Sequence, residues 1–119
     1  MARPRNFVEE EVIALAAATF SRLGFNGTTI DDLLTATDLQ RGSLYKAFGS
    51  KKELFEKVLA AALTDGWTQR QDALDLLIVA LKELAANDRA IARLCRQAIA
   101  NTEADVVQLL GKRLLQNLK

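Results

Sequence analysis

Apolar residues recur every three to four positions along most of the chain, which is the spacing of amphipathic helices. The first stripe lies in residues 7–23, and Gly24 ends this predicted helix because glycine takes the left-handed conformation at low cost. Asn6 is placed to cap the first amides, with Glu9 three residues later as a capping-box partner. The apolar stripe comprises Val8, Val12, Leu15, Ala16 and Leu23, widened by Ile13, Ala17 and Phe20.

Two much shorter helices follow. Phe25 folds back as an apolar plug, and Asn26-Gly27 makes the turn. Thr28 or Thr29 caps the first short helix, where Asp31 and Asp32 favour its positive end. Its buried face comprises Ile30, Leu33 and Leu34.

The second short helix is predicted to begin near Gln40 or Arg41, after a turn at residues 37–39, and to run to about Ala47. Leu44 and Phe48 lie one turn apart and face inward. Gly49 ends this helix. The segment Ser50-Lys51-Lys52-Glu53 has the form of a capping box that opens the next helix, which runs to about Asp65 before Gly66. The apolar residues of that helix are Leu54, Phe55, Val58, Leu59, Ala62 and Leu63.

Further helical stripes occupy the second half. Residues 70–86 have apolar residues at helical spacing, which are expected to face inward. Asn87-Asp88 is expected to end this helix and to cap the next one. A long amphipathic helix is then expected from Ile91 to Leu118; Asn101-Thr102 is a potential interruption, but we expect the helix to be continuous. The inward residues of 70–86 are Leu74, Leu77, Ile78, Leu81, Leu84 and Ala85, and those of the long helix are Ile91, Leu94, Cys95, Ala98, Ile99, Val106, Leu109, Leu110, Leu114 and Leu118.

The composition supports an all-helical fold. Of 119 residues, 50% are hydrophobic and 26% charged, with a single Pro and no strand pattern or repeat. We predict an all-α chain: a three-helix, homeodomain-like helix-turn-helix domain with a linking helix in residues 1–65, and a helical dimerisation segment in residues 66–119. The lone Cys95 excludes an internal disulfide, and no apolar run is long enough to span a membrane.

Net charge alone, at +1, does not suggest nucleic acid. On charge alone, an ordinary mixed-charge surface explains the chain better than a DNA-binding face does. The distribution is more informative, because residues 39–57 carry five cations against Glu53 and Glu56, and Arg3 and Arg5 form a short basic arm. The five cations are Arg41, Lys46, Lys51, Lys52 and Lys57.

Short helices between tight turns, with small and basic residues facing outward, are typical of a helix-turn-helix that enters the DNA major groove. Gln40 and Arg41 fall in the first turn of the second short helix, from which arginine can pair with guanine and glutamine with adenine. Gly42 permits close approach. The remaining candidates are Ser43 and Tyr45 for base edges or phosphates, Lys46, Lys51 and Lys52 for phosphates, Thr28 and Thr29 at the first short helix, and the arm of Arg3 and Arg5.

Each of these residues also has an ordinary interpretation. Tyr45 is equally suited to a partly buried position beside Phe48, and Arg41 and Lys46 to plain solvent exposure. Gly42 by itself is only a weak point in a helix. The specific signal is the ordered set with both turns correctly placed.

Residues 8 to about 59 resemble the N-terminal domain of the tetracycline-repressor (TetR) family of transcriptional regulators. The matching pieces are Phe20, Gly24-Phe25, Thr28-Thr29-Ile30, Gly42-Ser43-Leu44-Tyr45, Phe48, Ser50-Lys51 and Leu54. The resemblance implies DNA contacts by residues 40–43, Tyr45 and Lys51, and a helix cap against a phosphate at Thr29.

The chain departs from the family pattern at three positions. Asp38 stands where the turn usually has Gly, but Asp tolerates the left-handed conformation. Gln40 replaces the common Ser or Thr cap, which weakens the start of the second short helix. Ala47 replaces the common His or aromatic residue, which removes one phosphate contact.

In the family the second domain dimerises and often holds an effector pocket, and residues 76–115 weakly resemble its late helices. The stretch from Gly66 to Leu76 is too short for the usual intervening helices, which leaves open a reduced protein or a piece of a longer one. We expect a homodimer through an exposed apolar stripe, or else a stripe folded back onto the first and fourth helices. The stripe comprises Leu94, Ile99, Val106, Leu109, Leu110 and Leu114.

An effector pocket is not favoured, although it stays open. Trp67 is expected to pack over the junction between the halves rather than line a pocket. Cys95 is expected to be a buried structural thiol rather than an oxidant sensor.

Three classes of function remain. The leading hypothesis is a cytoplasmic repressor, nucleoid-associated when bound, whose homodimer recognises a palindromic operator in double-stranded DNA. The alternative is a helical interaction protein that pairs with related regulators and does not bind DNA. An enzyme is disfavoured because the chain has no His, no clustered metal ligands and no Gly-rich phosphate loop. We expect no cofactor and no metal.

Overall fold

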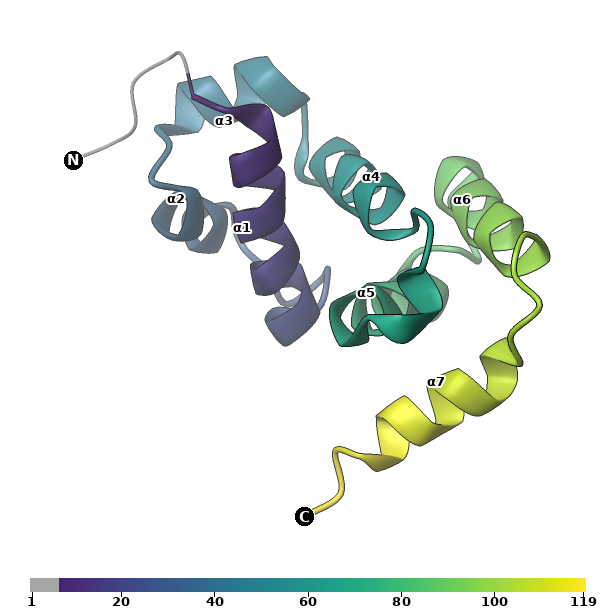
Figure 1. Cartoon of the computed structure of the whole chain (residues 1–119). Coiled ribbons are helices and arrows are strands. Elements are labelled where there is room, and N and C mark those ends of the chain that lie inside the picture. Colours follow the sequence, from purple (N-terminus) through teal and green to yellow (C-terminus); the bar gives the residue numbers. More distant parts are fainter. Residues whose placement is uncertain (1–6) are drawn as a thin grey trace.

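The computed structural model describes residues 7–119, and its regular elements are all helices (Figure 1). This confirms the all-α prediction. In chain order the elements are α1 (Glu9–Leu23), α2 (Ile30–Thr37), α3 (Arg41–Phe48), α4 (Lys51–Ala62), the 3-10 turn η1 (Trp67–Gln69), α5 (Gln71–Glu83), α6 (Arg89–Ala100) and α7 (Val106–Leu115). Arg3, Arg5 and the predicted cap Asn6 lie outside the described residues.

The predicted turns of the first half are confirmed in detail. Gly24 has φ 80° and Gly49 has φ 90°, so both end their helices in a conformation that favours glycine. Asp38 has φ 59° and closes α2 in the left-handed conformation that the usual Gly would take. Because the turns on both sides of α3 form as expected, α2 and α3 adopt a helix-turn-helix arrangement.

Three aromatic rings from separate elements form the centre of the first half. Phe25 is buried and stacks on Phe20 at 6.0 Å, which confirms its role as a plug. Phe55 of α4 meets Phe20 edge-on at 5.0 Å and Phe25 at 5.5 Å. Such pairs stabilise a core beyond the area that they bury, so the orientation of α4 against α1 is strongly specified.

Helix α5 joins the two halves into one core. It packs against α1, α4, α6 and α7, and it buries residues on nearly every side. At its C-terminal end, Glu83 Oε1 accepts the backbone N–H of Asn26 at 2.7 Å, which ties α5 to the α1–α2 loop. The buried core therefore continues from residue 12 to residue 106. The boundary at residues 65–66 stays a prediction.

Several predicted helix boundaries and faces were wrong. α1 begins at Glu9 with Val8 as its N-cap and no side-chain cap bond, and α4 ends at Ala62 rather than Asp65. The predicted stripe members Val8, Leu15 and Leu81 are exposed. On α5, Leu74 and Leu77 are buried as predicted, but Ala73, Leu76, Val79 and Ala80 are buried as well, because α5 has neighbours on several sides.

The largest error concerns the expected long helix, which is broken at residues 101–105. Asp105 accepts the Gln108 amide at 3.1 Å and Thr102 Oγ accepts the Ala104 amide at 3.2 Å, so local side chains replace helical bonds here. Figure 1 shows α7 bending away from α6. Arg113 holds α7 to α5 through Asp75, with Nε–Oδ1 at 2.7 Å and Nη2–Oδ2 at 3.1 Å.

Candidate DNA-binding surface

Helix α3 presents most of its surface to solvent. Of its eight residues, only Leu44 and Phe48 are buried, at 3% and 4% exposure. Figure 1 places α3 at the edge of the molecule remote from α7. The predicted reading residues lie together here: Gln40, Arg41, Gly42, Tyr45 and Lys46 are exposed, and Ser43 is half-buried.

The underside of α3 is held by aromatic contacts. The Phe48 ring lies 6.4 Å from the ring of Phe7, and the Lys57 ammonium lies 5.9 Å from the Phe48 centroid. A hollow of about 190 Å³ lies beside Phe7, Ser43, Lys46 and Ala47. No role was predicted for Phe7 from the sequence.

The first turn of α3 is open and contains no acidic residue. Gln40 is the N-cap but makes no side-chain cap bond, which agrees with the expected weak start of this helix. A Cβ placed on Gly42 would have no other atom within 4 Å among the described residues. Uncapped amides at a helix N-terminus favour anions, so this end of α3 suits a close approach to a polyanion.

Arg41 is exposed but is not unpaired. Its Nη2 donates to Asp31 Oδ1 of α2 at 2.7 Å, and the two side chains are 54% and 82% exposed. The sequence analysis had placed Asp31 only at the positive end of α2. Ten residues separate the two groups, so their meeting depends on the α2–α3 turn.

Lys51 does not belong to the exposed basic surface. Its Nζ donates to the backbone oxygens of Phe25 and Thr28, each at 3.0 Å, and lies 4.4 Å from the centroid of the Phe25 ring. The ammonium therefore closes the α1–α2 loop against the start of α4. Lys51 is therefore engaged within the protein, and its expected phosphate contact stays a prediction.

Lys52 is likewise engaged within the protein. Its Nζ lies 3.0 Å from Asp88 Oδ2 and 3.3 Å from Glu56 Oε1, so it joins α4 to the N-cap of α6. The bond with Asp88 raises the pKa of Lys52. The amide of Ile91 and then Lys52 lower the pKa of Asp88. Lys52 thus faces the second half of the chain rather than the surface of α3, and its expected phosphate contact stays a prediction.

The two candidate threonines differ. Thr28 is 1% exposed and its hydroxyl donates to the Gly24 oxygen at 2.6 Å, so its side chain is removed from the candidate surface. Thr29 is exposed and forms a complete capping box with Asp32, which confirms it as the cap of α2. The Thr29 amide lowers the pKa of Asp32. Two acids at this helix end make it less suited to a phosphate than the start of α3.

The predicted capping box at Ser50 is confirmed in its first half. Ser50 Oγ accepts the Glu53 amide at 3.1 Å. This bond fixes the start of α4 directly after Gly49, and so sets where α3 ends.

The expected dimerisation stripe is divided by the break between α6 and α7. Val106 is buried at 9% exposure, and Leu94, Leu109 and Leu110 pack partly buried against the core. Only Ile99 and Leu114 of the six are exposed, at 37% and 50%. Val107 and Leu115, which the sequence analysis did not select, are exposed at 84% and 64%. The outward apolar face of α7 thus differs from the predicted one.

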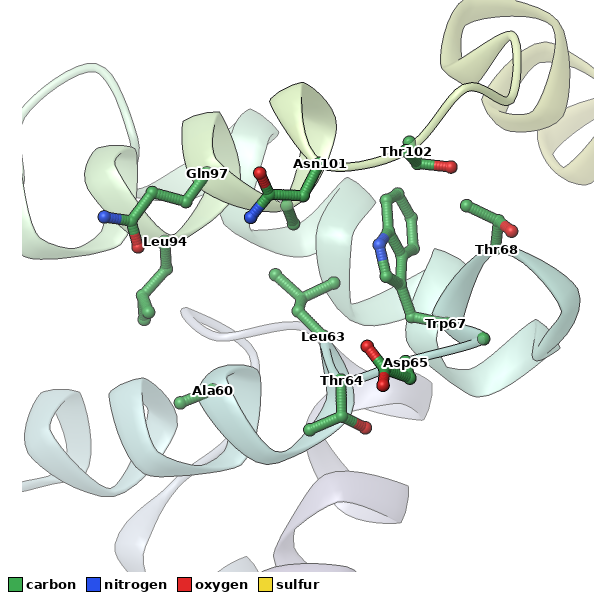
Figure 2. A pocket seen from close by; sticks show the side chains of 12 residues that line it. Ala60, Leu63, Thr64, Asp65, Trp67, Thr68, Leu94, Gln97, Asn101 and Thr102 are labelled. Atoms are coloured by element: carbon green, nitrogen blue, oxygen red, sulfur yellow. The ribbon is translucent and has the colours of Figure 1, made fainter.

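A cavity of about 250 Å³ adjoins Trp67, where the end of α4 meets the end of α6. Trp67 is 5% exposed, which agrees with its expected place at the junction, but it also lines this cavity, contrary to the expectation that it would not line a pocket. Figure 2 shows Asp65, Asn101 and Thr102 around its indole. The volume lies below the roughly 300–1,000 Å³ typical of ligand pockets. An apolar groove of about 520 Å³ also lies between α5 and α6, lined in part by Leu81, Cys95 and Ile99.

Cys95 is buried, as expected, with 2% of its surface exposed. Burial raises the pKa of its thiol, so the reactive thiolate is disfavoured at neutral pH. Within residues 7–119, no cluster of three potential metal-ligating side chains occurs. No helix in this range combines the length and the apolar character that a bilayer span requires.

Comparisons with known proteins agree with the geometry of α1 to α4. Residues 12–58 match the family model described as bacterial regulatory proteins, tetR family. The HTH-type transcriptional repressor BdcR of Escherichia coli (strain K12) is 33% identical over 90 residues, which are 70% of this chain and 46% of that protein.

A second relative is the biofilm operon icaADBC HTH-type negative transcriptional regulator IcaR of Staphylococcus aureus (strain Newman). It is 36% identical over 50 residues, which are 42% of this chain and 27% of that protein. The chain therefore spans less than half the length of either relative. No solved structure matches the chain.

Proposed function

We propose that this chain, which belongs to the tetR family of bacterial regulatory proteins through its residues 12–58, is a sequence-specific DNA-binding transcriptional regulator. The observation that carries the proposal is the exposed surface of α3, where Gln40, Arg41, Tyr45 and Lys46 lie on a helix with only two buried side chains. A short, outward helix preceded by a tight turn has the form of a recognition helix.

In the proposed complex, α3 lies in the major groove with its first turn toward the base edges. Gln40 and Arg41 read adenine and guanine, and Gly42 lets the backbone approach closely. Lys46 and the hydroxyl of Tyr45 contact phosphates, and Ser43 contacts a base edge or a phosphate. Lys51 and Lys52 support the arrangement from within the protein. Arg3 and Arg5, which lie outside the described residues, stay candidate DNA contacts.

Repression is the regulatory outcome that the relatives favour, because one is named a transcriptional repressor and the other a negative transcriptional regulator. A protein that occupies an operator excludes polymerase from it. We place this activity in the cytoplasm, on the nucleoid, and assign the chain no catalytic activity.

A homodimer completes the proposal. The exposed apolar side chains of α7, Val107, Leu114 and Leu115, lie on a helix that the bidentate Arg113–Asp75 pair holds rigidly to α5. Exposed apolar patches of this kind mark interfaces. A two-fold dimer through α7 would present two α3 helices to a palindromic operator, with half-sites one helical turn or a multiple apart.

The alternative function is a helical interaction protein that pairs with related regulators without binding DNA. Two observations favour it: the apolar face of α7 is exposed, and Lys51 and Lys52 are both used within the protein. This alternative needs α7 but not Gln40, Arg41 or Tyr45. A small-molecule effector is not part of the proposal, since the cavity beside Trp67 is small and the larger groove between α5 and α6 is open to solvent.

One experiment separates the two functions. The purified chain is incubated with a random-sequence duplex library at low and moderate salt, and bound sequences are recovered while sedimentation reports the mass of the complex. Enrichment of a palindrome by a dimer supports the regulator. Binding of no duplex, or equal binding of all sequences at low salt alone, overturns it and favours the interaction protein.

A further inference from the structure

Asp31 and Arg41 form the one ion pair between α2 and α3 among the described residues, at 2.7 Å. Asp31 is the second residue of α2 and Arg41 the first residue of α3. The pair therefore crosses the turn of the helix-turn-helix and ends at the residue best placed to read a base.

Stability does not explain this pair. Both side chains are more than half exposed, and exposed ion pairs contribute little to folding. The start of α2 already has the Thr29–Asp32 capping box, so it does not need Asp31 as a cap. Arg41, by contrast, is a cation at the positive end of α3, an unfavourable position that a nearby carboxylate offsets.

The geometry leaves Arg41 able to bind a second group. A guanidinium has five N–H donors, and only a bond from Nη2 to Asp31 is present. The remaining donors include those needed for the O6 and N7 acceptors of guanine. At the same time the carboxylate repels phosphate oxygens, the commonest alternative partner of an arginine at a DNA surface.

We propose that Asp31 is a specificity-determining residue: it holds Arg41 toward a guanine edge and keeps it off the phosphate backbone. The inference rests on the proposed DNA-binding function. It means that a residue of α2 contributes to the base specificity of α3. Lys46, also exposed on α3, has no carboxylate partner among the described residues and remains available for phosphates.

The test compares Asp31→Asn with Glu10→Gln, in the full chain. Glu10 is an exposed acid at the second position of α1, as Asp31 is at the second position of α2, so both changes raise the net charge equally. Affinities are measured for the site selected from the random library and for an unrelated duplex. Arg41→Ala and the Asp31→Asn/Arg41→Ala double variant complete a cycle.

We expect Asp31→Asn to lower the ratio of specific to non-specific affinity about two- to five-fold, mainly by strengthening non-specific binding. Glu10→Gln should leave that ratio unchanged, and Asp31→Asn should not change it when Arg41 is already Ala. Circular dichroism of each variant checks that the helices are retained.

Equal ratios for Asp31→Asn and Glu10→Gln would overturn the inference while leaving the proposed function intact. An effect of Asp31→Asn that persists in the Arg41→Ala background would also overturn it, because the action would not pass through Arg41. A parent chain that selects no sequence would overturn the proposed function and the inference together.

Discussion

Helix α3 and the first turn of α4 are adjacent in the chain and each carry two cations, yet these cations are placed differently. Arg41 and Lys46 of α3 are exposed on a helix that buries only two side chains. Lys51 and Lys52 of α4 bind carbonyl oxygens and carboxylates of the protein itself, on a helix that buries five.

The difference shows that positive charge alone does not identify a DNA contact. A lysine beside a loop with unpaired carbonyl oxygens is used to close that loop, whereas a lysine with no partner remains available for phosphates. We therefore interpret α4 as a helix that supports the domain and α3 as the surface that contacts DNA. This division of roles between the two helices is testable.

The largest expected effect is on the free energy of unfolding, through the core contacts of α4. Phe55→Ala removes a fully buried ring that contacts Phe20 and Phe25, and should lower the free energy of unfolding by about 3–5 kcal/mol. Tyr45→Ala in α3 should change it by less than about 0.5 kcal/mol. Urea unfolding measures both. Equal losses would show that α3 is as deeply integrated as α4.

The next effect is on the reading surface. Arg41→Ala should cost about 1–3 kcal/mol of binding to the selected operator and relax the choice of base at one position. Arg93→Ala, an exposed arginine on α6, is the matched control and should leave binding unchanged. Fluorescence anisotropy with the operator and its single-base variants provides the measurement. Unchanged binding by Arg41→Ala would remove this residue from the reading surface.

Replacing a lysine by methionine should affect stability in α4 but DNA binding in α3. Lys51→Met removes two hydrogen bonds from a charged donor and should lower the free energy of unfolding by about 1–2 kcal/mol. Lys46→Met should leave it nearly unchanged, but should reduce the dependence of log K on log salt by about 0.9. The division fails if Lys51→Met, under conditions where it is folded, shows the larger change in salt dependence.

Gly42→Ala should have a smaller effect, and it should change stability and DNA binding in opposite directions. The added methyl group would have no other atom within 4 Å among the described residues, so the variant should be more stable by up to about 1 kcal/mol because alanine favours helices. DNA binding should weaken if the backbone of α3 approaches the bases closely. Thermal unfolding and operator titration together separate the two effects. Unimpaired binding would place Gly42 away from the groove.

The smallest effect concerns the link from α4 to α6. The pKa of Asp88 is lowered from 3.8, so its contribution to stability is present above about pH 4 and lost as the pH falls through its folded pKa. Because Lys52 is 40% exposed and solvent screens the pair, we expect less than about 1 kcal/mol. Asp88→Asn keeps a cap but removes the charge, so its stability should converge on that of the parent chain at acidic pH. A difference that does not depend on pH would contradict this role.

Local chemistry determined much of the fold from the sequence alone. The helix ends at Gly24 and Gly49, the cap at Thr29 and the left-handed turn at Asp38 each depend on conformational preferences of a few neighbouring residues. The outward face of α3 follows from the spacing of Leu44 and Phe48. Boundaries with weaker local signals, such as the end of α4, were predicted less accurately.

Only the tertiary structure decided which charged and apolar groups are free. The partners of Lys51 and Lys52 come from the α1–α2 loop and the start of α6, and the partner of Arg41 comes from α2. The apolar residues of α7 divide between α5 and solvent because residues 101–105 turn the chain. A sequence pattern places a side chain on a face of its own helix, but the identity of the group opposite depends on how distant segments pack together.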